Sequence, residues 1–343
     1  MTIYDIAKRC GVSPATVSRV LNGTGPVRPE VAARVRQVVE ESGYAPKPRP
    51  RRSQKTPDGF IGVLLPQTGH SYYDRVVRTL QQQLPDLDKL MVLLPVDPHS
   101  EDLWVSRLGQ LPLDGVILLQ EDLSPTVSQA LLRSEIPAVM CGALSLTRSF
   151  PAVHVDDQAA AYDGISYLVS LGHRRIGLIS DDPKDISSGS QRLSGCKKAL
   201  ADNGIVCPPG WIRSKGCTRD DGYHGARYLL TAHPELTAIF AFSDAAAYGA
   251  MKAAMDMGFQ VPGEISILGF DDILPQEHGL PGLTCIHQPM EEIVSRTLAL
   301  LQAEKTSGTA PVSVTLRHSI ITRDSCSHPR NYKLQEDHHG SRD

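Results

Sequence analysis

Two patterns of apolar and polar residues divide this chain. From Phe60 onward, short apolar runs of strand length are separated by longer segments in which apolar residues recur at helical spacing. The expected strands are Phe60–Leu65, Leu90–Pro95, 115–119, Ala138–Cys141, Ile176–Ser180, a short one near Ile212, 238–242 and 265–270. The expected helices are 72–84, 126–134, 158–171, 192–203, 220–232, 245–257 and 290–301.

Strands that alternate with helices along a chain form parallel sheets covered by helices. The pattern starts again after residues 153–155, which predicts two α/β lobes. In such folds the carboxyl ends of the strands border a cleft, and ligands bind there.

The first 46 residues have a different, all-helical pattern. A capping box at residues 2–5 opens a first helix, Ile3–Cys10, and a tight turn at Gly11 leads to a second helix capped by Ser13. Two short helices joined by such a turn form a helix-turn-helix, whose second helix enters the major groove of DNA. Pro29 opens a third helix with an apolar stripe of Val31, Val35, Val38 and Val39.

The second helix has one apolar side and one polar side. Val17, Val20 and Leu21 share the first, while hydroxyl, amide and guanidinium groups share the second and suit DNA phosphates and base edges. Arg19 is expected to bind a guanine through O6 and N7. The candidate DNA-contacting residues of this domain are Thr2, Ser13, Pro14, Ala15, Thr16, Ser18, Arg19 and Asn22.

Several stretches of the chain resemble the LacI/GalR family of bacterial transcription regulators. The N-terminal stretches are TIYDIA (2–7), GVS (11–13) and TVSRVLNG (16–23), and looser landmarks are PLDGVI (112–117), LGHRRI (171–176), AIFAFSD (238–244) and SILGFDD (266–272). The resemblance implies a small all-α helix-turn-helix DNA-binding domain followed by a two-lobe α/β domain like a periplasmic binding protein. Three chain crossings would join its lobes.

These observations predict the domain limits. The DNA-binding domain covers 1–46, a basic linker 47–58, the effector-binding and dimerisation domain 59–325, and a disordered tail 326–343. By analogy with the family, the first lobe holds residues 59–156 and 288–308, and the second holds 157–287 and 309–325. The adjacent His338 and His339 in the tail do not make a metal site without further ligands.

The linker departs from the family pattern. Relatives usually carry a hinge helix whose Leu wedges into the minor groove, but Lys47, Pro50 and Ser53 stand where Asn, Ala and Leu are expected. Alternating Pro and Arg favour an extended arm instead. The linker is therefore either an arm that contacts DNA or a solvated tether. In the first case its contacts come from Arg49, Arg51 and Arg52.

Charge is unevenly distributed along the chain. Residues 1–55 carry eleven Lys or Arg and four acidic residues, a net charge of +7, so the remainder carries −10 of the total of −3. A basic head on an acidic body predicts a polyanionic partner at one end. Seven scattered Cys indicate reduced thiols, and with no signal peptide and no apolar run near the roughly 18 residues of a membrane span, a cytoplasmic bacterial protein is expected.

The resemblance also implies an effector site between the lobes. Arg192 matches a guanidinium that holds effector oxygens, Asp271 a carboxylate that accepts effector hydroxyls, and Tyr72 and Tyr73 an aromatic pair at the edge of the cleft. Ser243 stands where sugar-responsive relatives often have Asn. Common phosphate-loop, nucleophile-elbow and zinc-protease motifs are missing, so neither catalysis nor a cofactor or metal is expected.

The sequence thus predicts a homodimeric repressor that binds a roughly palindromic operator under the control of a sugar or sugar derivative. Whether the effector releases or tightens DNA binding is left open. Cys217 and Gly142, at positions where relatives present an aromatic ring and an acid, leave the effector unidentified. One alternative is a transporter's solute-binding protein, which predicts an export signal and no basic head. The other is a DNA-binding α/β enzyme, which predicts a catalytic constellation.

Overall fold

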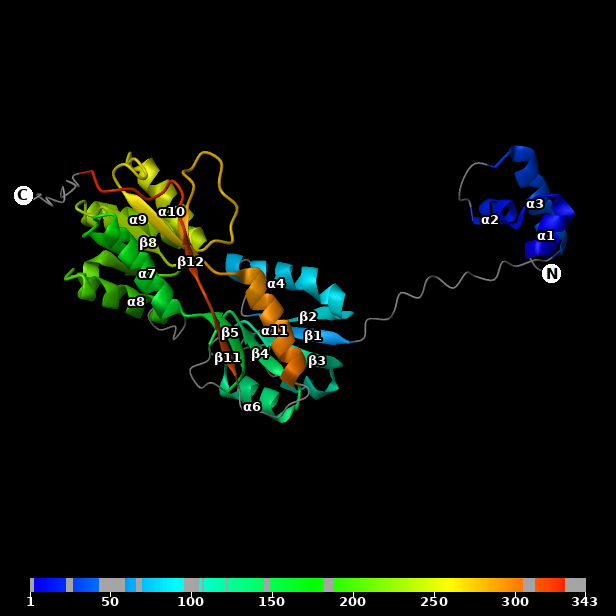
Figure 1. The fold of residues 1–343 in the computed structure, drawn as a ribbon, viewed down its shortest axis with the longest axis horizontal. Helices are drawn as coiled ribbons and strands as arrows, with labels where there is room; N and C mark the ends of the chain where they lie inside the picture. The colour runs from blue at the N-terminus through cyan, green and yellow to red at the C-terminus, as the bar shows by residue number, and fades with distance from the viewer. Residues whose placement is uncertain are drawn as a thin grey trace, which may run out of the picture. The chain divides into compact units, whose positions relative to one another are not determined.

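The computed structural model divides the chain into two compact units, residues 1–56 and 57–343 (Figure 1). The residues that the structure describes are 3–22, 27–42, 59–65, 70–95, 105–106, 108–120, 123–144, 149–181, 188–304 and 312–330. None of the helices in these ranges combines the length and the apolar character that crossing a lipid bilayer requires.

The N-terminal unit is a three-helix cluster, as expected. Its helices are α1 (Ile3–Cys10), α2 (Pro14–Asn22) and α3 (Pro29–Ser42). Ser13 caps α2, because its hydroxyl accepts the backbone N–H of Thr16 at 3.2 Å. The buried core is Ile6, Ala7, Cys10, Val17 and Val35, and the remaining valines of the α3 stripe pack against it.

The first lobe of the larger unit is built on a parallel sheet with the strand order β11-β5-β4-β3-β1-β2. Its strands are β1 (Phe60–Leu65), β2 (Leu90–Pro95), β3 (Leu113–Leu118), β4 (Ala138–Cys141), β5 (Ala152–Val155) and β11 (Ser313–Leu316). The strands β4 and β5 are buried along their whole length, which explains why all of their residues except His154 are apolar.

Helices cover both faces of this sheet. They are α4 (Ser71–Gln83), α6 (Pro125–Arg133) and α11 (Met290–Glu304), with the short 3₁₀ helices η1 (Leu84–Leu87) and η2 (Leu108–Gln110). On one face, Val76 and Leu80 of α4 and Ile293 of α11 share a core cluster. On the other, Val127 and Leu131 of α6 fill a second cluster.

The second lobe repeats this plan. Its sheet has the order β12-β10-β9-β8-β6-β7, with only β12 antiparallel to its neighbour among the described strands. The strands are β6 (Ile176–Ser180), β7 (Ile212–Ser214), β8 (Ala238–Ala241), β9 (Ser266–Asp271), β10 (Thr284–His287) and β12 (Ser319–Ile321). The expected two-lobe α/β fold is confirmed.

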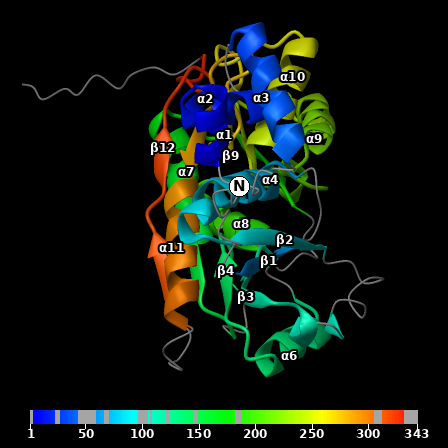
Figure 2. The same cartoon turned by 90° about the vertical axis from the view of Figure 1, so that its right-hand side faces the viewer.

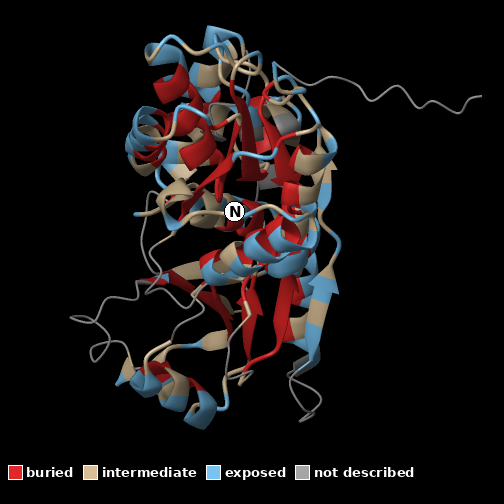
Figure 3. Cartoon of the chain, turned by 90° about the vertical axis from the view of Figure 1, so that its left-hand side faces the viewer, coloured by how far each residue is buried: buried red, intermediate tan, exposed pale blue. Residues whose placement is uncertain are grey.

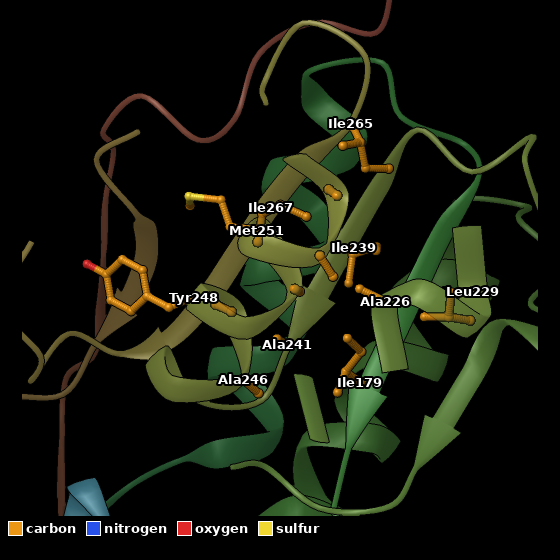
Figure 4. Close-up of a cluster of buried hydrophobic side chains, with 14 of the residues drawn as sticks. Ile179, Ala226, Leu229, Ile239, Ala241, Ala246, Tyr248, Met251, Ile265 and Ile267 are labelled. Atoms are coloured by element: carbon orange, nitrogen blue, oxygen red, sulfur yellow. The ribbon is translucent and has the colours of Figure 1, made fainter. Parts of the chain in front are cut away.

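Two helix pairs enclose the second sheet. They are α7 (Asp157–Ser170) with α8 (Ser188–Asp202), and α9 (Arg219–Ala232) with α10 (Asp244–Asp256), and η3 (Pro209–Trp211) precedes β7. Figure 4 shows the cluster in which Met251, Ile239 and Leu229 join α10, the sheet and α9. In Figure 3 most strands are buried, while the exposed residues lie largely on helices.

The chain passes between the lobes three times, after β5, after β10 and after β11. Helix α11 returns to the first lobe as predicted, but the assignment of residues 309–325 to the second lobe is wrong in its first part. β11 pairs with β5 of the first sheet, with Ser313 opposite Ala152. β12, labelled in Figure 2, joins the second sheet beside β10. Backbone hydrogen bonding to an open sheet edge decides this placement.

The predicted disordered tail also begins too early. Residues 326–330 lie against the second lobe, where the Cys326 thiol donates to the carbonyl of Ile267 at 3.2 Å and the N–H of Ser327 donates to the Ser266 hydroxyl at 3.1 Å. The ring of His173 lies 2.9 Å from the carbonyl of Ser327. His338 and His339 lie outside the described residues.

Candidate functional site

The candidate DNA-contacting helix α2 presents two different sides. Val17 is fully buried in the three-helix core, whereas Arg19 is exposed. Ser13 and Thr16 lie together at the start of the helix, with their hydroxyl oxygens 2.9 Å apart. Pro14, the first residue of α2, is partly exposed. The other DNA-contacting candidates lie outside the described residues: Thr2, Arg49, Arg51 and Arg52 entirely, and Ala15, Ser18 and Asn22 in their side chains.

Arg192 is the centre of the candidate effector site. It is 8% exposed, its Nε donates to Asp157 Oδ1 at 2.7 Å, and its Nη1 donates to the carbonyl oxygen of Phe242 at 2.6 Å. Its guanidinium carbon lies 3.7 Å from the centroid of the Phe270 ring. Although burial alone would lower it, Asp157 and Asp271 raise the pKa of Arg192 above its ordinary value.

Close packing of two helices brings Arg192 to Asp157. Gly195 of α8 lies against the backbone of α7, and a Cβ atom on it would come 2.1 Å from the carbonyl oxygen of Gln158. A larger residue would force the helices apart, so the glycine permits Arg192 to reach the first turn of α7.

Asp271 ends β9 beside Arg192. The residue is 2% exposed, Arg192 Nη1 lies 3.8 Å from its Oδ1, and the same oxygen accepts Gln288 Nε2 at 2.7 Å. Its backbone has φ +102°, in the region that L-residues rarely occupy, as does that of Asp272 at +57°. Burial raises the pKa of Asp271, and nearby Asp244 raises it further, although Arg192 opposes both.

The start of α10 adds Ser243 and Asp244 to the second-lobe part of the candidate site. The Ser243 hydroxyl caps this helix by accepting the N–H of Ala246 at 3.0 Å, and it donates to the carbonyl of Cys217 at 2.6 Å. Asp244 Oδ2 accepts the N–H groups of Ile273 at 2.7 Å and Leu274 at 3.2 Å. Burial raises the pKa of Asp244 from 3.8 to about 6.

The first lobe contributes aromatic side chains from the start of α4. The Tyr72 hydroxyl donates to the carbonyl of Gly142 at 3.4 Å, and Tyr73 packs against His70 with ring centroids 4.8 Å apart. Gly142 has φ +74°, and a Cβ atom there would come 1.8 Å from the Tyr72 oxygen.

Electrostatic interactions cross from one lobe to the other at this point. Burial raises the pKa of Tyr72 well above its usual value, and the carboxylates of Asp271 and Asp157 add to the effect. Burial lowers the pKa of His70, which also experiences the charges of Asp181 and Arg192. The start of α4 in the first lobe therefore faces the ends of β6 and β9 and the start of α8 in the second.

Several buried polar atoms at this place have no hydrogen-bond partner among the described residues. They are Gln288 Oε1, Asp244 Oδ1 and His70 Nδ1. Gln288 and Asp244 are 1% and 2% exposed, so water cannot readily satisfy these atoms in the folded protein. A guanidinium and carboxylates beside aromatic rings can hold a small polar molecule. No group of His, Cys, Asp and Glu in the described part of the chain is arranged to hold a metal ion.

The structure thus brings the predicted residues Arg192, Asp271 and Tyr72 near one another, while Ser243 is engaged as a helix cap and Tyr73 stacks on His70. Sequence reasoning missed Asp157, Asp244, Gln288 and His70. Asp157 and Asp244 begin helices, where carboxylates are common for reasons of capping and dipole interaction alone. No local signal distinguishes them from other helix-starting acids.

Comparisons with known proteins agree with both units. Residues 2–47 match the model for bacterial regulatory proteins of the lacI family, and residues 165–326 match a periplasmic binding protein-like domain. Catabolite control protein A of Priestia megaterium is 29% identical over 329 residues, which span 95% of this chain and 99% of that protein. The HTH-type transcriptional repressor CytR of Escherichia coli (strain K12) is 31% identical over 302 residues, 88% of either chain.

A solved structure also resembles the chain over nearly its whole length. It is described as a complex of the transcriptional regulator CelR with cellobiose, it is 26% identical, and it superposes with a TM-score of 0.71. The match covers 95% of this chain and 99% of that one.

Proposed function

This chain belongs to the LacI family of bacterial transcription regulators, and from that premise we propose that it is a homodimeric repressor whose operator binding is controlled by a sugar or sugar derivative. That it is a DNA-binding transcription regulator follows from the family. The repression, the dimer, the effector class and a cytoplasmic location are the proposal. Two relatives support this proposal. One with 31% identity is named a repressor, which supports repression, and one of known structure is described as a complex with cellobiose, which supports a sugar effector.

The observation that carries the effector proposal is the buried Arg192, held by Asp157 next to Asp271 where the lobes face each other. Burying several charges costs free energy, and packed apolar residues of similar volume would be at least as stable. Such a cluster is easier to explain as a binding site, because guanidinium and carboxylate groups make strong, directional hydrogen bonds to hydroxyl groups.

Asp271 and its neighbour Asp272 connect the site to segments near the crossings between the lobes. Asp271 binds Gln288, which lies between β10 and α11, where the chain crosses to the first lobe. The next residue, Asp272, accepts Arg323 Nη2 at 2.8 Å, beyond β12, and lies 3.1 Å from His287 Nδ1. An effector held by Asp271 would bias the relative arrangement of the lobes, and thereby a population of states with different DNA affinity.

The proposal is tested by selecting operators from random duplex DNA with the full-length protein and then measuring binding by fluorescence anisotropy. We expect a roughly palindromic consensus, because a symmetric dimer presents two copies of α2. Adding a binding sugar should then lower operator affinity if it is an inducer, or raise it if it is a co-repressor. A selected operator whose affinity responds to none of a broad panel of sugars and nucleosides would contradict the effector proposal.

A further inference from the structure

We propose that Gly59, Lys89 and Asp114 form an anchor that fixes the chain where the linker enters the first lobe, and that Lys89 and Asp114 are positioning residues for operator binding. This proposal rests on the homodimer proposed above, whose two DNA-binding domains bind two half-sites together. The linker, residues 47–58, lies outside the described residues and ends directly before Gly59.

Gly59 is tied to the edge where the first sheet begins. The next residue, Phe60, is the first of β1 and pairs with Leu90 of β2 on one side and with Leu113 of β3 on the other. The N–H of Leu90 donates to the carbonyl of Gly59 at 3.1 Å. The first described residue after the linker is therefore held by the sheet.

An ion pair between the two flanking strands crosses over Gly59. Lys89, directly before β2, donates from Nζ to Oδ2 of Asp114 in β3 at 2.6 Å. A Cβ atom on Gly59 would lie 1.7 Å from that Oδ2 and 3.2 Å from that Nζ, so the ion pair fills the space of a side chain at position 59. The two side chains are only 19% and 27% exposed, so water and salt screen their attraction less than that of a surface pair.

A β-bulge brings Asp114 into this position. Phe60 lies opposite Leu113, but Ile61 lies opposite Gly115, so Asp114 is an extra residue in β3. Bulges are rare between parallel strands, and they often redirect a side chain near a functional site. The bulge accounts for the approach of this carboxylate to the start of β1.

The anchor rests on the packed core of the first lobe. Leu301, in the last turn of α11, is 3% exposed, and a Cβ atom on Gly115 would come 2.8 Å from its side chain. Gly115 directly follows Asp114, so close packing restricts movement of the bulge. A fixed anchor gives the linker a defined starting direction, and a chain rich in proline keeps its direction over several residues.

This direction matters when two domains of a dimer bind one DNA molecule. Once the first domain holds a half-site, the second binds with an effective concentration that depends on the freedom of its linker. Releasing the anchor lets the linker start in more directions, which lowers that concentration. The anchor should therefore strengthen binding to a full operator and leave the binding of one domain to one half-site unchanged.

Two substitutions break the ion pair and change the net charge in opposite directions. A general electrostatic effect would raise DNA affinity in Asp114→Asn and lower it in Lys89→Met. Loss of the anchor should instead lower the affinity for the full operator about three- to tenfold in both variants. Asp202→Asn and Lys198→Met are the matched controls, because they make the same charge changes in an exposed ion pair of α8 with the same distance of 2.6 Å.

Binding is measured by fluorescence anisotropy of the full-length proteins at constant ionic strength. The duplexes are the selected operator, the same operator with one half-site scrambled, and one with extra base pairs between its half-sites. Both anchor variants should bind the scrambled duplex within about twofold of wild type. Their preference for the selected spacing should fall at least about threefold, because a freer linker tolerates other spacings.

Gly59→Ala is the second kind of variant, because its Cβ atom displaces the ion pair and leaves both charges in place. It should give the same pattern as the two charge variants. Urea unfolding identifies the variants that are folded under the assay conditions, and only these are compared.

Three results would overturn the proposal. They are full-operator affinities that stay at the wild-type value, affinities that shift in opposite directions in Asp114→Asn and Lys89→Met, and half-site binding that weakens as much as operator binding. A wild type that binds the full operator no better than the scrambled duplex would contradict the proposed homodimer as well. A wild-type advantage that the variants retain would refute the anchor alone.

Discussion

The two lobes have the same strand order but different chemistry where they face each other. When the strands of each lobe are numbered along the chain, they follow the same spatial order in both sheets. The last of them, β11 in the first lobe and β12 in the second, lies at one edge. The first lobe presents the aromatic rings of Tyr72 and Tyr73, while the second presents Arg192, Asp157 and Asp271. One lobe therefore supplies flat apolar surfaces and the other supplies charge and hydrogen bonds.

This difference predicts that the two lobes have different roles in the proposed effector binding. The charged side chains of the second lobe are tied to one another, to the Phe242 carbonyl and to Gln288, so they are positioned before a ligand arrives. On the first-lobe side, the hydrogen bond from the Tyr72 hydroxyl to the carbonyl of Gly142 is long at 3.4 Å. The second lobe is thus expected to determine recognition, and the first to close over what is bound.

The largest effect should come from removing the central charge of the second lobe. Arg192→Ala leaves Asp157 buried without its partner, so we expect the free energy of unfolding to fall by about 3–5 kcal/mol. The folded variant should bind the operator but show no effector response. Urea unfolding and fluorescence anisotropy measure the two effects, with Arg227→Ala, an exposed arginine of α9, as the control. Loss of operator binding in folded, dimeric variant protein would refute the assignment.

The buried carboxyl of Asp244 should make stability depend on pH. Its pKa is about 6 in the folded protein and 3.8 in an ordinary setting, so the folded state binds the proton more tightly. Stability relative to Asp244→Asn should therefore fall as the pH rises from about 4 to about 6, by at most about 3 kcal/mol.

Asp256→Asn provides the opposite case for comparison. The Lys252 hydrogen bond lowers the pKa of Asp256, so the stabilisation from that pair is present above the ordinary pKa and is lost as the pH falls. Denaturant unfolding at several pH values measures both variants. A difference between wild type and Asp244→Asn that does not change with pH would show that Asp244 is not perturbed by burial.

The contribution of Tyr72 in the first lobe is tested by a substitution at Gly142. Gly142→Ala introduces a Cβ atom that overlaps the Tyr72 hydroxyl at a backbone φ of +74°. We expect a loss of about 1–3 kcal/mol of stability and effector binding weakened about tenfold. Gly204→Ala is the matched control, because Gly204 has φ +66° with nothing within 4 Å of an added Cβ. Equal effects in the two variants would mean that backbone strain alone, and not Tyr72, is responsible.

The smallest and most local effect should lie outside both lobes. Arg19→Ala should cost about 1–3 kcal/mol of operator binding at one base pair in each half-site, because a bidentate contact to guanine is lost. The effector response should remain, since neither lobe has changed. Binding to a set of single-base operator variants measures it. An unchanged preference at every position would rule out base readout by Arg19.

Local patterns account for much of what could be predicted. The buried strands β4 and β8 were expected because a strand covered on both faces is apolar throughout. Helix α8 was expected to start at Arg192 but begins at Ser188. Ser and Gly are weak helix formers, and the local sequence does not show that Gly189 and Gly195 pack against other segments of the chain.

The sequence by itself determined the elements, the helix-turn-helix and the residue types available for binding, since these depend on periodicity and short motifs that act over a few residues. Only the tertiary structure decided that β11 belongs to the first lobe, that Asp157 pairs with Arg192 and that Gln288 binds Asp271. Those choices depend on which sheet edge is open and which helices approach closely. Both are properties of the packed chain, because they join residues far apart in the sequence.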